Sequence, residues 1–148
     1  MKKFFFDCGT RDLTASLGIF VLRVSIGLMM LLGHGLDKIK AFGTKKDAFP
    51  VPDLFPLKYM TPPISMMATI SAEVVAAGLL IIGLATRPAA FVLSFTMVIA
   101  AFQIHHSDPF LVKEKALLYL AAVVTVLLTG AGSWSLDATL CKEKRRRW

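Results

Sequence analysis

The sequence predicts an all-α integral membrane protein, a four-helix bundle with both termini on the same side of the membrane. Of its 148 residues, 55% are hydrophobic and only 18% are charged, whereas soluble domains are about 45–50% apolar and about 25% charged. The apolar residues also gather in blocks close to the roughly 20 residues that a helix needs to cross a bilayer. We expect a single domain, residues 1–148.

Four segments are candidate spans: residues 14–36, 64–85, 88–105 and 116–133. Only two residues separate the second from the third, and Pro88 suits the first turn of a helix, where its missing N–H costs little. The fourth segment carries no charge, and Gly130 and Gly132 offer it a stop.

The distribution of basic residues predicts the orientation. Four spans place both ends on one side, together with Lys2, Lys3, Arg11, Arg87 and the basic tail 142–147. The positive-inside rule then favours cytoplasmic termini in the plasma membrane, although five lysines in the first loop weaken this prediction. The formal net charge of +7 suits anionic lipid headgroups, so the bilayer is the expected partner and nucleic acid is not.

Several classes of chemistry lack their motifs. The chain has no GxSxG, HExxH, P-loop or GxGxxG pattern. No motif in the sequence therefore supports a hydrolase or a nucleotide-driven pump. Its two cysteines, Cys8 and Cys141, lie near opposite ends and form no CxxC or zinc-type cluster. We therefore expect them to be structural or incidental rather than redox-active.

Arg23 and Glu73 are opposite charges near the middle of two apolar segments. A charge at that depth costs at least about 2.5–3.5 kcal/mol, so it usually faces the interior and finds a partner. At about 100° per residue, Arg23 shares a stripe with Gly27 and His34, and Glu73 shares one with Thr69. We predict an Arg23–Glu73 pair, which either lines a ligand cavity or acts as a structural lock between the two helices.

A second polar cluster is expected at the outer ends of the helices. Its members are His34, Asp37, Lys38, His105, His106, Glu114, Lys115 and, one turn deeper, Tyr119. Histidine can exchange protons near neutral pH or bind a metal. Adjacent histidines on a helix point about 100° apart, so a metal would need His34 and Glu114 as well, and we expect none. Headgroup-level histidines without a role are the alternative.

The first loop, residues 37–61, is long and combines prolines with aromatic residues. Long loops are either functional or disordered, and the aromatic residues argue against disorder. We expect a lid on the outer surface. The alternative is an interfacial loop whose aromatic rings only sit at headgroup depth.

Three segments carry a resemblance to a known family. They are LRVSIGLMMLLGHGLDK (22–38), EVVAAGLLIIGLATRPAA (73–90) and EKALLYLAAVVTVLLTGAGSWSLDA (114–138). Their order resembles the DoxX family of small four-span membrane proteins over residues 22–140, with the last segment the most specific. The family pattern places an Arg, a Lys, a Glu and a His where this chain has Arg23, Lys38, Glu73 and His105. Ala131 stands where a Pro is common.

The resemblance implies a membrane subunit of an oxidoreductase system linked to thiosulfate, quinone and thiol-stress chemistry. No intrinsic cofactor is expected, and a quinone or a small sulfur species would bind between the helices, with electrons supplied by a redox partner protein. Arg23, Glu73 and His105 would be the catalytic residues, and the ligand would be bound by His34, Lys38, Glu114 and Tyr119. The alternatives are a non-catalytic scaffold or assembly factor, and a small-solute transporter or channel, which would require a homo-oligomer.

Overall fold

A computed structural model describes residues 12–140, and every regular element in this part of the chain is helical. The first helix runs without a break over 36 residues, Leu13–Ala48. It comprises α2 (Leu13–Met30), the π-helical turn η1 (Leu31–Gly35), α3 (Leu36–Lys45) and the 3₁₀ turn η2 (Lys46–Ala48). The predicted span 14–36 is thus the first part of a longer helix.

The remaining helices follow after a loop that contains the 3₁₀ turn η3 (Leu57–Tyr59). The second helix joins α4 (Pro62–Ser71), the π-helical turn η4 (Ala72–Ala76) and α5 (Ala77–Ile82). The third joins α6 (Thr86–Ile99) to the π-helical turn η5 (Ala100–Ile104), and α7 (Phe110–Thr129) completes the set.

Local sequence accounts for most helix ends. The Asp12 carboxylate accepts a hydrogen bond from Ala15 N at 2.7 Å and caps α2, while two prolines open α4. Gly83 ends α5 in the left-handed conformation, with φ 71°. Gly130 ends α7 as predicted, with φ 83°.

Three of these helices are long and apolar enough to cross a membrane: Leu13–Ala48, Pro62–Ile82 and Thr86–Ile104. The fourth predicted span, 116–133, overlaps α7, which begins at Phe110, and its bounds stay a prediction. α7 carries the charged residues Lys113, Glu114 and Lys115 in its first two turns, where the prediction had Glu114 and Lys115 open the fourth helix. α7 has 20 residues in all.

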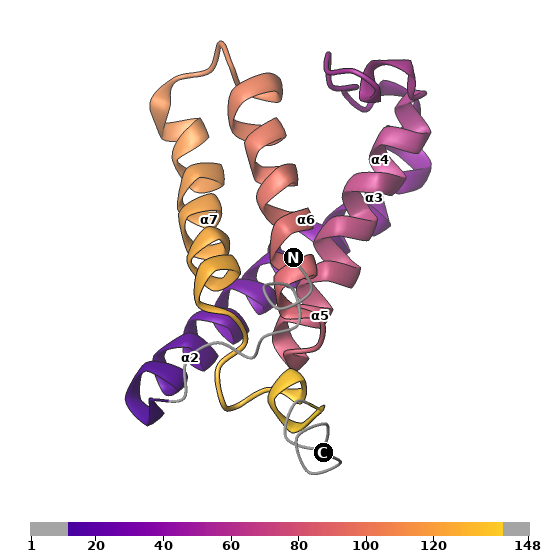
Figure 1. Cartoon of the computed structure of the whole chain (residues 1–148). Helices are drawn as coiled ribbons and strands as arrows, with labels where there is room; N and C mark the ends of the chain where they lie inside the picture. Colours follow the sequence, from indigo (N-terminus) through magenta and orange to yellow (C-terminus); the bar gives the residue numbers. More distant parts are fainter. Residues whose placement is uncertain (1–11, 141–148) are drawn as a thin grey trace.

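The helices pack around one apolar core (Figure 1). α6 lies beside α7, and α2 packs against α5 and α7. α3 and α4 contact each other and diverge from the α6–α7 pair. The core draws on α2, α5, α6 and α7, and its most deeply buried large side chains are Met30, Leu80, Leu93, Val123 and Val126.

Polar contacts join three segments at one end of the helices. Ser16, near the start of α2, donates a hydrogen bond to Ser133 Oγ at 3.2 Å, and Asp137 N donates to Gly83 O at 2.9 Å. The Asp137 carboxylate also accepts from Ala85 N and Thr86 N, at 2.8 and 2.9 Å, and so caps α6. Cys8, Cys141, Arg11 and the basic tail lie outside the described residues, so the predictions about them stay predictions.

Candidate functional site

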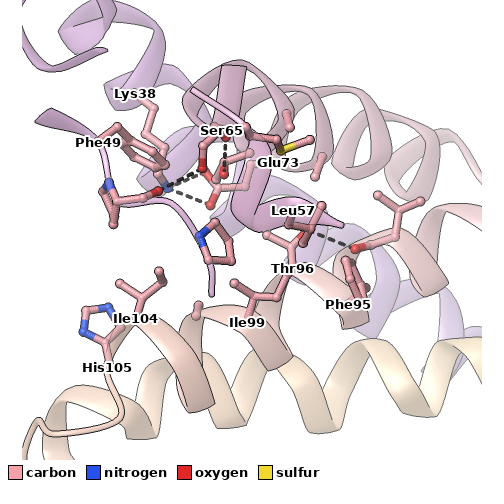
Figure 2. Close-up of a pocket in the computed structure, with 18 of the residues that line it drawn as sticks. Lys38, Phe49, Leu57, Ser65, Glu73, Phe95, Thr96, Ile99, Ile104 and His105 are labelled. Atoms are coloured by element: carbon pink, nitrogen blue, oxygen red, sulfur yellow. Dashed lines mark hydrogen bonds and ion pairs between the residues drawn. The ribbon is translucent and has the colours of Figure 1, made fainter. Parts of the chain in front are cut away.

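A cavity of about 520 Å³ lies between the first loop, the α4–η4 segment and the α6–η5 segment. Its wall is mostly apolar, and Figure 2 shows the polar groups that interrupt it. Loop residues Phe49, Pro50, Pro52, Leu57 and Met60 cover one side. The loop therefore covers one side of the cavity, and its role as a lid stays a prediction.

The charged groups of the cavity wall form an ion pair between α3 and η4. Lys38 Nζ lies 2.6 Å from each carboxylate oxygen of Glu73 (Figure 2). The Glu73 side chain is only 5% exposed and that of Lys38 is 26% exposed. The pair is thus largely withdrawn from solvent, with the ammonium at its more accessible end.

All three π-helical turns lie next to candidate site residues. Glu73 belongs to η4, His105 follows η5 directly, and η1 ends three residues before Lys38. A π-turn holds one residue more than an α-turn, so it changes the face that the following residues present, and such turns are frequent at functional sites. The π-helical turns η4 and η5 thus lie at the cavity, and η1 lies one helical turn from Lys38.

Two glycines set the register between the first and second helices. A Cβ on Gly35 would lie 2.8 Å from Val74 Cγ2 and 3.3 Å from Glu73 O. A Cβ on Gly27 would lie 2.6 Å from Ile81 Cγ1. These close approaches place Glu73 level with Gly35, one helical turn from Lys38.

The predicted Arg23–Glu73 pair is wrong. Arg23 lies 12 residues before Gly35, which is about 18 Å along a helix at 1.5 Å per residue. Both charged residues are buried as predicted: counted over the whole residue, Arg23 is 1% exposed and Glu73 is 3% exposed. The prediction failed because it assumed that the two helices pack with their centres at one depth, whereas the glycine contacts shift their register.

Arg23 instead binds backbone carbonyls at the other end of the helices. Its Nη1 donates to Leu80 O at 2.6 Å and to Ile81 O at 3.1 Å, and its Nη2 donates to Trp134 O at 2.6 Å. These carbonyls belong to the last turn of α5 and to the segment after α7. Arg23 thus joins three parts of the chain and does not line the cavity.

Hydroxyl groups supply the remaining polar atoms near the ion pair. Ser65 Oγ donates to Pro50 O at 2.9 Å and ties the loop to α4. Thr69 and Thr96 donate to carbonyls of their own helices, at 2.9 and 3.0 Å. Ser65, Thr69 and Glu73 follow one another at intervals of four residues, a spacing that could have identified Ser65 from the sequence.

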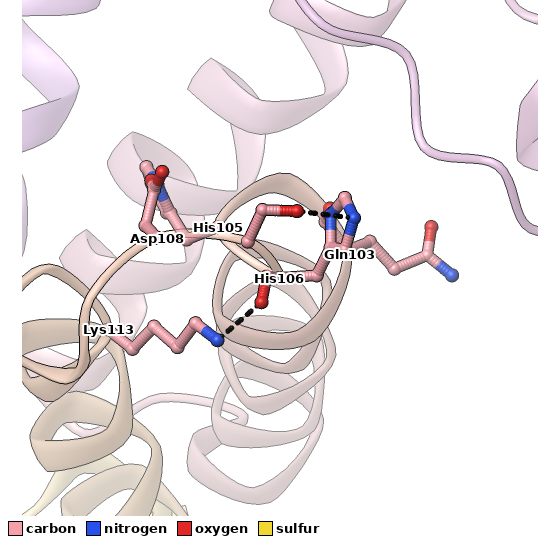
Figure 3. Close-up of polar contacts among 6 residues, drawn as sticks. Gln103, His105, His106, Asp108 and Lys113 are labelled. Atoms are coloured by element: carbon pink, nitrogen blue, oxygen red, sulfur yellow. Dashed lines mark hydrogen bonds and ion pairs between the residues drawn. The ribbon is translucent and has the colours of Figure 1, made fainter.

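His105 also lines the cavity, on the wall opposite Lys38 (Figure 2). Its Nδ1 lies 2.6 Å from a carboxylate oxygen of Asp108, and both side chains are more than a third exposed. His106 Nδ1 instead lies 3.1 Å from Gln103 O, and Figure 3 shows its ring beside Gln103, away from Asp108. The two histidines therefore point to different surroundings, as predicted.

The rest of the predicted outer cluster lies elsewhere. His34 packs edge-on against Tyr119, with ring centroids 5.6 Å apart. Glu114 is half-buried near the start of α7, and none of these three residues lines the cavity. Within residues 12–140, no group of three His, Cys, Asp or Glu side chains could hold a metal ion.

The structure thus brings together three of the seven predicted site residues, Lys38, Glu73 and His105. It adds Ser65, Thr69, Thr96, the loop residue Phe49 and the aromatic side chains Phe91 and Phe95 of α6. The loop aromatic residues stood out in the sequence, but Phe91 and Phe95 read as ordinary residues of an apolar helix.

Comparison with known proteins identifies one family. The DoxX family model matches residues 18–106, which is more than half of the chain. The match contains Arg23, Lys38, Glu73 and His105 and ends before α7, so it does not include the segment 114–138. No curated protein and no solved structure shows significant similarity to the chain.

Proposed function

Because the chain belongs to the DoxX family, we propose that it is a membrane subunit of an oxidoreductase system that binds quinone. Its three strongly apolar helices support a multi-pass membrane protein. In this proposal α7 is the fourth span of a four-helix bundle, and both termini lie on the cytoplasmic side of the plasma membrane. A partner protein that oxidises a sulfur compound or a thiol supplies the electrons.

The cavity suits such a ligand. Its volume of about 520 Å³ lies within the roughly 300–1,000 Å³ typical of small-molecule sites, which are mostly apolar with a few placed polar groups. Here the placed groups are Lys38, Glu73 and His105. A bound quinone would supply two-electron chemistry, taking up two protons as it is reduced to the quinol.

The ion pair carries the proposal. A lysine ammonium has three N–H donors, and Lys38 directs two of them to Glu73. The third is available for a ligand oxygen, while the carboxylate holds the ammonium in place. An interaction with a cation also stabilises the negative charge that develops on a quinone oxygen during reduction.

Proton supply is assigned to the opposite wall. His105 lines the cavity and contacts Asp108, and both side chains are accessible enough to exchange protons with water. A carboxylate partner fixes the orientation of an imidazole and the ring nitrogen that carries its proton. His105 would therefore deliver protons to the ligand, with Asp108 positioning the ring.

Quinone binding to the full-length protein in lipid nanodiscs tests this function. Lys38→Met should weaken binding by at least about tenfold, equivalent to roughly 1.4 kcal/mol, because it removes the free donor. Lys45→Met is the matched control, since Lys45 is exposed on the same helix α3 and does not line the cavity. It should bind quinone like the parent protein.

A double variant separates this proposal from a scaffold. Lys38→Met alone leaves a buried, unpaired carboxylate, which is strongly destabilising. Lys38→Met/Glu73→Gln removes both charges and should recover the thermal stability but not the quinone affinity. A parent protein that binds no quinone, with a double variant that still captures its partner proteins, would favour the scaffold.

A further inference from the structure

The cavity reaches the surface of the molecule between α4 and α6. Three of its lining residues on α6 are among the more exposed apolar side chains: Phe91 at 56%, Val92 at 44% and Phe95 at 43%. On the facing helix α4, Ala68 is also exposed and lines the cavity. These four residues border an apolar opening.

This opening lies between two helices that are apolar and long enough to cross a membrane, Pro62–Ile82 and Thr86–Ile104. When such helices are embedded in a bilayer, their exposed apolar faces contact acyl chains. The border of the opening is likewise apolar, so it offers no hydrogen-bond partners to water. A molecule dissolved in the bilayer would meet no polar barrier.

The other side of the cavity is covered by the loop. Pro52 is buried, and Pro50 is tied to α4 by the hydrogen bond from Ser65 Oγ. Phe49, Leu57 and Met60 add apolar side chains to the same wall. The loop therefore covers this side of the cavity, whereas nothing comparable lies across the α4–α6 opening among the described residues.

We propose that the cavity fills sideways from the bilayer, through the opening between Ala68 on α4 and Phe91, Val92 and Phe95 on α6. Its ligand is then an uncharged amphiphile whose head contacts Lys38 and Glu73 while its tail leaves along the aromatic face of α6. This inference rests on the proposed function, because the quinone is the probe. To the proposed function it adds the direction from which the ligand enters and the residues that contact the ligand's apolar tail.

The charge balance supports an uncharged head. Lys38 and Glu73 neutralise one another at 2.6 Å, so the pair presents no net charge to attract an anion. It offers one N–H donor and the remaining lone pairs of a carboxylate, which match a carbonyl or hydroxyl oxygen. The outer half of the ligand would meet only carbon, on Phe91 and Phe95.

Photolabelling in nanodiscs tests the geometry directly. A decyl-benzoquinone carrying a diazirine at the end of its tail should label α6 between Phe91 and Phe95, or Ala68 on α4. A matched probe with the diazirine on the ring should label the wall around Lys38 and His105. Tail labelling of the loop between Phe49 and Met60 would overturn the proposal.

Narrowing the opening provides a second measurement. Ala68→Trp should slow association of the decyl-quinone and lower its affinity by at least about tenfold. Val75→Trp is the control, since Val75 is 60% exposed on the same helix and does not line the cavity. If Ala68→Trp does not fold, as judged by size-exclusion chromatography and melting, Val92→Trp narrows the same opening from the other side.

The outcomes separate the two proposals. If the parent protein binds no quinone, the proposed function fails, and sideways access fails with it. If the parent protein and a folded narrowed variant bind quinone with equal affinity and equal association rate, the function stands and the route is wrong.

Discussion

At the scale of single residues, the two buried charges Arg23 and Glu73 each find a polar partner on another element. Arg23 binds the carbonyls of Leu80 and Ile81, which close α5. Carbonyls at a helix C-terminus carry partial negative charge and favour a cation. Glu73 finds an ammonium instead, from Lys38. A charge in such a helix therefore predicts burial and a polar partner, but the partner itself depends on which elements meet there.

Replacing Arg23 tests its structural role. Arg23→Leu removes the donors to three carbonyls, one of them Trp134 O, and should lower the free energy of unfolding by about 2–4 kcal/mol. Arg23→Lys keeps a charge but lacks the forked guanidinium, so its loss should be smaller. Denaturant titration in mixed micelles measures both. An Arg23→Leu variant as stable as the parent protein would contradict this role.

At the scale of elements, close helix contacts and π-turns together determine which residues face the cavity. Gly27 and Gly35 allow the first helix to approach the second, as small residues do in membrane proteins. The π-turns η1 and η4 contact one another. The cavity wall thus depends on backbone geometry as much as on the identities of its side chains.

Alanine substitutions at glycine test this packing. Gly27→Ala would place a Cβ 2.6 Å from Ile81 Cγ1 and 3.0 Å from the backbone oxygen of Ala77, and should cost about 1–3 kcal/mol of stability. Gly18→Ala, in the same helix, meets nothing within 4 Å. It should be neutral or slightly stabilising, because alanine favours the helix over glycine. Thermal unfolding of both variants decides, and equal effects would refute the close contact.

A second pair of glycines tests the site itself. Gly35→Ala would press on Val74 and Glu73, whereas Gly33→Ala in the same π-turn meets nothing within 4 Å. We expect Gly35→Ala to reduce quinone affinity by shifting Glu73 relative to Lys38, and Gly33→Ala to leave it unchanged. Binding measured in nanodiscs distinguishes them. Equal affinities would show that the ion pair tolerates movement of η4.

At the scale of the whole molecule, polar contacts lie at both ends and an apolar core lies between them. One end holds the Arg23 contacts and the Asp137 cap, and the other holds the loop, the ion pair and the His105–Asp108 contact. Side chains from α2, α5, α6 and α7 fill the middle. This division suits a protein whose centre lies in hydrocarbon.

Labelling of single cysteines tests the proposed topology. In a chain with Cys8 and Cys141 replaced by serine, Ser107→Cys and Leu136→Cys lie on opposite sides of α7, and both positions are exposed. If α7 is the fourth span, an impermeant maleimide added to intact cells should label Ser107→Cys, which faces the outside. Leu136→Cys, on the cytoplasmic side, should be protected until the cells are opened. Labelling of both from outside would exclude α7 as a span.

Much of the fold could be predicted because it depends on local properties. The lengths of the apolar segments and the stop at Gly130 follow from composition and backbone preference. α7 begins before the predicted span, since a helix can continue through the charged residues 113–115 where its end reaches a polar environment. The aromatic face of α6 could not be recognised, because phenylalanine in an apolar helix carries no sign of the cavity beside it.

By itself the sequence determined an all-helical chain with segments able to cross a membrane and with buried charges, because apolar length and the cost of burying a charge are properties of each segment alone. The match over residues 18–106 identifies the DoxX family. Only the tertiary structure decided that Glu73 pairs with Lys38 and that Arg23 joins the last turn of α5 to the segment after α7. The reason is register: contacts at Gly27 and Gly35 shift two neighbouring helices along one another. Such a shift changes neither the length nor the composition of a helix, but it changes which residues face Arg23 and Glu73.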